Sequence, residues 1–243
     1  MARIFITGST DGLGLAAAQS LLDKGHHLVV HARSPERLGA VQGLMERGAA
    51  GVVGDLSDME QVRGLAGQVK RSGPVDVVIH NAGVFSGPHI FMVNVVAPYL
   101  LTALMHRPRR LIYLSSGMHR GGRDALAGSH GSGLVPSVSY SDSKLYLTAL
   151  AAAVARLWPD VASNAVDPGW VPTRMGGAGT PDDLRLGHLT QEWLATSDDP
   201  EALSSGGYWY HQHRRQAHDA VYDQPFQDAL LDYLARVTGE RLS

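Results

Sequence analysis

The chain has 243 residues, of which 44% are hydrophobic and 18% are charged, and its net charge is −2. This composition is typical of a folded protein, and the length suits one α/β domain or at most two small ones. The balance of 21 Lys and Arg against 23 Asp and Glu predicts no nucleic-acid partner held by a broad basic surface. The lack of cysteine excludes disulfides, thiolate metal sites and a cysteine nucleophile.

Short β-branched runs alternate with longer helical patterns, which is the order of βαβ units and a parallel sheet. The predicted strands are Arg3–Thr7, Leu28–His31, Gly51–Val53, Val75–Ile79, Arg110–Ser115, Ser163–Val166 and Tyr208–His211. The predicted helices are Gly12–Lys24, Pro35–Arg47, Asp58–Arg71, Val93–Met105, Tyr140–Leu157 and Gln224–Val237, with Ser34 and Asp58 as N-caps. We therefore expect a single α/β domain over residues 1–243, built on one doubly wound parallel sheet of about seven strands.

Two segments interrupt this alternation. Residues Gly117–Ser137 are rich in Gly, Ser and His and predict a long loop. Residues Thr173–Pro200 are rich in Gly, Asp and Pro, with one amphipathic piece at Leu184–Leu194. Long irregular segments in compact domains are usually functional, so we expect residues 173–200 to form a substrate lid.

The segment Thr7–Gly14 follows the first predicted strand and opens the first predicted helix. Glycines permit a tight turn and let the backbone approach a diphosphate, while the helix N-terminus supplies N–H donors and partial positive charge. The pattern Gly12-x-Gly14-x-x-Ala17 fits the dinucleotide fingerprint, but the spacing Gly8-x-x-x-Gly12-x-Gly14 fits the turn better. A glycine-rich turn without a ligand is the alternative.

Tyr140 and Lys144 stand four residues apart at the start of a predicted helix, so their side chains share a face. A nearby ammonium lowers the pKa of a phenol, which can then exchange a proton with a carbonyl or alcohol oxygen. Ser116 follows a predicted strand, where its hydroxyl could hold a substrate oxygen. The alternatives are a solvated helix face and a serine that bonds the backbone.

Other chemistries find less support in the sequence. Ser141 and Lys144 match the S-x-x-K motif of serine acyl enzymes, but neither K-T-G nor S-D-N accompanies them, and G-x-S-x-G does not occur. His211 and His213 would share one face of a strand without a convincing ligand set, so we expect no metal. Residues Met1–Thr7 do not resemble a signal peptide, and Asn94 and Pro98 interrupt the longest apolar run. We expect a cytoplasmic protein with no membrane partner.

Several motifs in chain order together resemble the short-chain dehydrogenase/reductase family over nearly the whole chain. They are the turn Gly8–Gly14, Asp55 in Gly54-Asp55-Leu56, Asn81-Ala82-Gly83, Asn94, the pair Ser115-Ser116, Tyr140 with Lys144, and Pro168-Gly169-Trp170-Val171-Pro172-Thr173. Segments Ser115–His119 and Ser205–Tyr208 are similar to the retinol-dehydrogenase-like and classical reductase branch.

The resemblance implies a Rossmann-type fold and hydride transfer between a nicotinamide and the carbon of a small or medium carbonyl or alcohol. It implies Tyr140 as acid and base, Lys144 as the group that lowers the pKa of Tyr140 and holds the ribose, Ser116 as oxygen ligand, and Asn94 as holder of a relay water. The implied cofactor-binding residues are Gly8, Ser9, Thr10, Asp11, Gly12, Leu13, Gly14, Arg33, Ser34, Asp55, Leu56, Asn81, Ala82, Gly83, Tyr140, Lys144, Pro168, Gly169, Val171 and Thr173.

The chain departs from the family pattern at three places. Asp11 stands where NADP-dependent members often carry a basic or neutral residue, and Asp167 replaces the commoner neutral or His residue before Pro168. The connection between Asn81 and Asn94 is short. These departures concern the turn, the nicotinamide loop and one wall of the pocket.

The second predicted strand ends at His31-Ala32-Arg33-Ser34 and carries no carboxylate for the ribose hydroxyls of NAD. Arg33 offers a planar, permanently charged fork for a 2′-phosphate, so we expect NADP(H) to be preferred over NAD(H).

The alternative to an oxidoreductase is a non-catalytic NADP-binding sensor or scaffold protein. A sugar-nucleotide epimerase usually has a larger C-terminal region. The small-residue run Ala149–Ala155 would suit a homo-oligomer interface or packing against the sheet.

Overall fold

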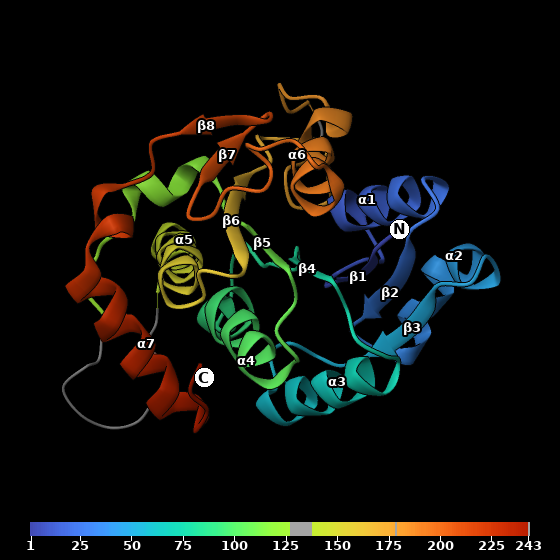
Figure 1. The fold of residues 1–243 in the computed structure, drawn as a ribbon, viewed down its shortest axis with the longest axis horizontal. Helices are drawn as coiled ribbons and strands as arrows, with labels where there is room; N and C mark the ends of the chain where they lie inside the picture. The colour runs from blue at the N-terminus through green and yellow to red at the C-terminus, as the bar shows by residue number, and fades with distance from the viewer. Residues whose placement is uncertain (127–137, 178, 243) are drawn as a thin grey trace.

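One mostly parallel sheet carries the fold of the computed structural model, which describes residues 1–126, 138–177 and 179–242 (Figure 1). Its eight strands lie in the order β3-β2-β1-β4-β5-β6-β7-β8 among these residues; all neighbours pair in parallel except β7 and β8. The strands are β1 (Arg3–Ile6), β2 (His27–Ala32), β3 (Ala50–Val53), β4 (Val77–His80), β5 (Arg110–Leu114), β6 (Ala162–Asp167), β7 (Tyr208–Tyr210) and β8 (His213–Arg215). The predicted fold class is confirmed.

Helices cover both faces of the sheet. They are α1 (Gly12–Asp23), α2 (Gln42–Glu46), α3 (Met59–Arg71), α4 (Ala97–Leu104), α5 (Tyr140–Leu157), α6 (Leu184–Thr196) and α7 (Gln224–Thr238). Helices α3, α4, α5 and α7 lie on one side, and α1 and α6 on the other (Figure 1). Successive side chains of β1 point to opposite faces of the sheet. Phe5 packs in the core beneath α3, α4, α5 and α7, whereas Ile4 and Ile6 pack in the core beneath α1 and α6. No helix of the described part is long and apolar enough to cross a bilayer.

The C-terminal edge of the sheet differs from the prediction. The seventh strand ends at Tyr210, and His211 and Gln212 have φ angles of 49° and 62°, so they form a hairpin turn into β8. His211 and His213 therefore do not share one strand face as expected. Hairpin turns of this kind usually carry Asn or Gly, and His-Gln gives no such signal, which is why the strand β8 went unpredicted.

Two predicted helices begin irregularly. Pro35–Arg47 divides into a 3₁₀ turn, Pro35–Val41, and the short α2, and Ser34 precedes it without a capping side-chain bond. Val93–Met105 begins as a π-helical turn, Met92–Val96, before α4. Pro98 has no N–H to donate to the carbonyl of Asn94, so the hydrogen-bond ladder is widened at that residue.

The other predictions of local structure agree more closely. Asp58 caps α3 as expected, since its carboxylate accepts bonds from the N–H groups of Glu60 and Gln61. In the predicted loop 117–137, Gly117–Gly121 form a 3₁₀ turn, while residues 127–137 lie outside the described part.

Candidate active site

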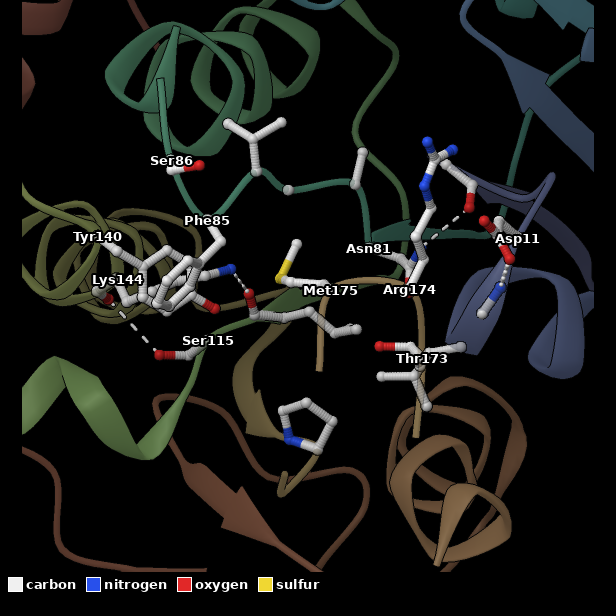
Figure 2. A pocket seen from close by; sticks show the side chains of 18 of the residues that line it. Asp11, Asn81, Phe85, Ser86, Ser115, Tyr140, Lys144, Thr173, Arg174 and Met175 are labelled. Carbon is white, nitrogen blue, oxygen red and sulfur yellow. Dashed lines mark hydrogen bonds between the residues drawn. The ribbon is translucent and has the colours of Figure 1, made fainter. Parts of the chain in front are cut away.

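Two adjoining cavities open at the carboxyl ends of the strands, near the point where the strand order reverses between β1 and β4. The first has a volume of about 680 Å³ and extends from the turn Gly8–Gly12 to Tyr140 and Lys144 (Figure 2). The second has a volume of about 800 Å³ and is bounded by Ser116, Trp170 and the end of β7. Tyr140 lines both cavities, so it stands where they meet.

The glycine turn forms the floor of the first cavity because side chains would not fit there. Gly8 has a φ of +66°, and a Cβ at this position would lie 3.0 Å from the Cα of Ala82. A Cβ at Gly14 would lie 2.3 Å from the carbonyl oxygen of Gly8. Asn81 fixes the turn from below, since its Nδ2 donates to the carbonyls of Thr7 and Gly8 at 2.9 and 3.2 Å. The exposed backbone and the first turn of α1 suit an anionic group.

A buried histidine also holds this turn, and no pattern in the sequence predicted its contact. The N–H of Gly8 donates to Nδ1 of His31 at 3.0 Å, while Nε2 lies 2.7 Å from the carbonyl oxygen of Gly54. This pairing requires a neutral ring with its proton on Nε2. Burial lowers the pKa of His31, which favours that neutral form. His31 is one residue of strand β2, and its position in the strand does not indicate that its side chain contacts the turn.

Tyr140 and Lys144 begin helix α5, where a capping box fixes their position. The Ser139 hydroxyl accepts a bond from the Asp142 N–H, and the Asp142 carboxylate accepts one from the Ser139 N–H. The Lys144 Nζ lies 5.5 Å from the centre of the Tyr140 ring, and it donates to the carbonyl oxygen of Leu114 at 2.6 Å. The predicted shared face of these two residues is therefore present.

The pKa of Tyr140 differs in direction from the sequence-based expectation. Burial raises the pKa of the Tyr140 phenol to about 12; a hydrogen bond with Ser116 opposes the shift, and the charge of Asp167 adds to it. Burial lowers the pKa of Lys144 to about 8, against the charge of Asp167. Lys144 is only 3% exposed and its ammonium donates to a backbone carbonyl, and desolvation is the largest influence on the pKa of the phenol. The phenol therefore keeps its proton at neutral pH.

Asn94 is fully buried on the π-helical turn and lines neither cavity among the described residues. Its Oδ1 accepts from the Val84 N–H at 2.8 Å, and its Nδ2 donates to the Val84 carbonyl at 2.9 Å and to Ser143 Oγ at 3.0 Å. The amide thus joins the loop after β4 to helix α5. Its role as holder of a relay water stays a prediction.

The predicted cofactor residues divide between the cavities and their surroundings. Those that line the first cavity are Gly8, Thr10, Asp11, Gly12, Leu13, Asn81, Ala82, Gly83, Tyr140, Lys144, Pro168 and Thr173. Gly169 and Val171 line the second cavity, as does Ser116. Those that line neither are Ser9, Gly14, Arg33, Ser34, Asp55 and Leu56. Ser9 is buried, and its Oγ donates to the carbonyl of Ile6 at 2.5 Å, so its side chain supports the turn.

Two arginines near the first cavity were not predicted. Arg37 lies beside the glycine turn, since its Nη2 is 3.4 Å from Thr10 Oγ1. Arg174 lines the cavity together with Asp11 and Asn81 (Figure 2). Arginine is the common basic residue of this chain, so no local pattern distinguished these two from the surface arginines.

The predicted lid segment contains a part that is anchored to the protein. Glu192 of α6 is buried and accepts 2.6 Å hydrogen bonds from Ser20 and Lys24, and a further bond from His188. Because Ser20 belongs to α1 and Lys24 ends it, α6 is fixed to the neighbouring helix. Residues 173–183, which precede α6, remain as the candidate for a moving element.

A family model described as short chain dehydrogenase matches residues 2–183. An uncharacterized oxidoreductase of Emericella nidulans is 37% identical and covers 98% of this chain and 98% of its own. A short-chain dehydrogenase of Gibberella zeae is 34% identical and covers 100% of this chain and 99% of its own.

Solved structures share the fold. A crystal structure of an uncharacterized protein from Mycobacterium paratuberculosis superposes with a TM-score of 0.78 at 22% identity, covering 100% of this chain and 95% of that one. A blue fluorescent protein from a metagenomic library, crystallised with NADPH, gives 0.69 at 24% identity, covering 86% and 95%. Together with the matched family model and the placement of Tyr140 and Lys144 beside the glycine turn, these likenesses show that the chain belongs to the short-chain dehydrogenase/reductase family of NAD(P)-dependent oxidoreductases.

Proposed function

We propose that this protein reduces a medium-sized, apolar carbonyl compound with NADPH, using Tyr140 as the proton donor. The observation that carries the proposal is the meeting of the two cavities at Tyr140, with Lys144 in the first and Ser116 in the second. One cavity has a floor of bare backbone that suits a dinucleotide, and the other has an apolar wall that suits the substrate.

When bound, the nicotinamide supplies the hydride that reduces the carbonyl carbon. Ser116 holds the carbonyl oxygen beside the phenol of Tyr140. The Ser116 hydroxyl and the phenol are joined by a hydrogen bond. Tyr140 gives its proton to that oxygen as negative charge develops there. Lys144, buried and cationic below its pKa of about 8, stabilises the phenolate that remains. Asn94 keeps α5 and the loop after β4 in register through Ser143 and Val84.

A preference for NADPH over NADH is supported by Arg33 and Arg37. Arg33 follows β2 and acts on the carboxylate after β3: burial raises the pKa of Asp55, but hydrogen bonds from Ser57 and the charge of Arg33 outweigh it. The guanidinium of Arg37 reaches Thr10 in the turn. Two cations therefore flank the region where the 2′-phosphate of NADPH would lie, and they offset the charge of Asp11.

The test is NADPH consumption with a panel of aryl and alkyl ketones, compared between wild type and Tyr140→Phe. Removal of a general acid should lower kcat by roughly 10²–10⁴-fold. Fluorescence titration should show nearly unchanged NADPH affinity, because the hydroxyl acts mainly in the transition state. Tight NADPH binding with no turnover of any carbonyl or alcohol would instead favour the sensor function.

A further inference from the structure

We propose that the second cavity selects its substrate by charge, accepting flat apolar ketones that are neutral or carry an ammonium group and rejecting keto acids. This inference rests on the proposed reductase function, since it concerns the substrate of that same site. It follows from the side chains that line the cavity and from the backbone that fixes them.

The walls of the cavity are made largely of aromatic and thioether side chains. Trp170 is 63% exposed, Phe85 52% and Met118 47%, although all three line the cavity. The Phe85 ring also lies against Tyr140, with ring centres 4.8 Å apart. Large apolar side chains left open to solvent beside a reactive group indicate a surface that a flat apolar ligand covers.

Every charged side chain among the described lining residues is an acid, namely Asp167 and Asp182. No basic side chain of the described part lies within ion-pair distance of either carboxylate. Burial and the charges of both carboxylates together raise the pKa of Tyr210, which lines the same wall. An anionic substrate would meet repulsion here, and a cationic one attraction.

The two carboxylates differ in how far other groups compensate them. Asp167 is 9% exposed and accepts bonds from the Gly169 N–H at 3.0 Å and the Tyr208 hydroxyl at 2.9 Å. Lys144 acts on it from the first cavity, and the Arg120 guanidinium carbon lies 5.2 Å from the ring centre of Tyr208, the residue whose hydroxyl donates to Asp167. The negative charge of Asp167 is therefore partly offset by these neighbours, and it acts on the catalytic centre.

Two hydrogen bonds to the backbone of Trp170 hold Asp182 in the wall of the second cavity. Its Oδ2 accepts from the Trp170 N–H at 2.5 Å, and its own N–H donates to the Trp170 carbonyl at 3.2 Å. Gly169 has a φ of +80°, and a Cβ there would lie 2.5 Å from Asp182 Oδ2. Arg215, which also acts on Tyr210, is exposed on β8 and does not line the cavity. Asp182 is thus the charge that a bound substrate would meet.

The experiment compares three ketones of one shape: 2-acetylnaphthalene and its 6-carboxylate and 6-aminomethyl derivatives. At neutral pH these are neutral, anionic and cationic. We expect wild-type kcat/KM with NADPH to follow the order cationic, neutral, anionic. Asp182→Asn should lower the ratio of cationic to anionic kcat/KM by about tenfold or more, because one charge acts in opposite senses on the two substrates. Asparagine still accepts the bond from Trp170, so the wall is kept.

Asp183→Asn is the matched control, because Asp183 is adjacent, caps α6 through the Arg185 N–H and does not line the cavity. Its ratio should stay within about twofold of wild type. Added salt should also lower the wild-type ratio, which tests the inference even if the Asp182 variant misfolds. This inference alone would be overturned if kcat/KM were equal for the three ketones or followed the reverse order. It would also be overturned if Asp182→Asn left the ratio of cationic to anionic kcat/KM unchanged. Turnover of none of these three ketones, with turnover of other ketones of the panel, would also overturn this inference alone, whereas turnover of no carbonyl at all would overturn the reductase function as well.

Discussion

Replacement of Arg33 by alanine should weaken NADPH binding and leave NADH binding almost unchanged. The 2′-phosphate is the chemical difference between the two cofactors, so a residue that reads it affects one of them only. Arg33 stands after the end of β2, where an NAD-specific chain would carry a carboxylate. Its charge already reaches Asp55, which follows β3: burial raises the pKa of Asp55, whereas the bonds from Ser57 and then Arg33 lower it.

The size of the effect follows from the exposure of the arginine. Hydrogen bonds to charged groups contribute about 1.5–3 kcal/mol, and Arg33 is exposed, so the lower end applies. This corresponds to a loss of NADPH affinity of about tenfold. Arg37→Ala should cost a similar factor, because its guanidinium lies at the same turn beside Thr10. Since the two arginines would share one phosphate, the double variant need not lose the product of the two factors.

The assay is direct titration of NADPH and NADH into wild type, Arg33→Ala and Arg37→Ala, at fixed ionic strength. Arg47→Ala serves as control, because Arg47 pairs with Asp23 at 2.6 Å and lines neither cavity. It should leave both affinities unchanged. Equal losses for NADPH and NADH in the Arg33 variant, or tighter binding of NADH by wild type, would refute the assignment of Arg33 to the phosphate.

Three further outcomes are expected. Arg174→Gln should weaken NADPH and NADH binding by the same factor in titration, because Arg174 lines the cavity near the glycine turn, where the proposed binding mode would place the diphosphate of either cofactor; a loss for NADPH alone would contradict this. NADPH should protect residues 173–183 from limited proteolysis but leave α6 equally resistant with and without it, and equal cleavage of 173–183 would argue against a lid. Burial raises the pKa of Asp142, but bonds from Arg123 and Ser139 outweigh it and hold the pKa at about 2. This lowered pKa stabilises the fold above about pH 4, so Asp142→Asn should cost ~2 kcal/mol at neutral pH in denaturant unfolding, with the gap closing as the pH falls from about 4 to 2.

Local chemistry explains which parts of the site could be predicted. Helix α5 has the bounds expected from the sequence, because Ser139 and Asp142 form a capping box directly before a long run of helix formers. The spacing of Tyr140 and Lys144 within it is a property of any helix. The contact of His31 with Gly8 joins residues far apart in the chain, and nothing near His31 in the sequence signals it. The hairpin at His211 was missed for a related reason, since its turn lacks the usual residues.

The same limit explains the pKa of Tyr140. Helical spacing fixes how near Lys144 lies, but the sign of the shift depends on a balance between charge and desolvation that the whole fold determines. Burial raises the pKa of the phenol to about 12 and lowers that of the ammonium to about 8, with Asp167 acting on both. A phenol that keeps its proton at neutral pH is ready to donate it to a carbonyl oxygen. Alcohol oxidation starts from the phenolate, so a protonated phenol is the form from which the proposed carbonyl reduction starts.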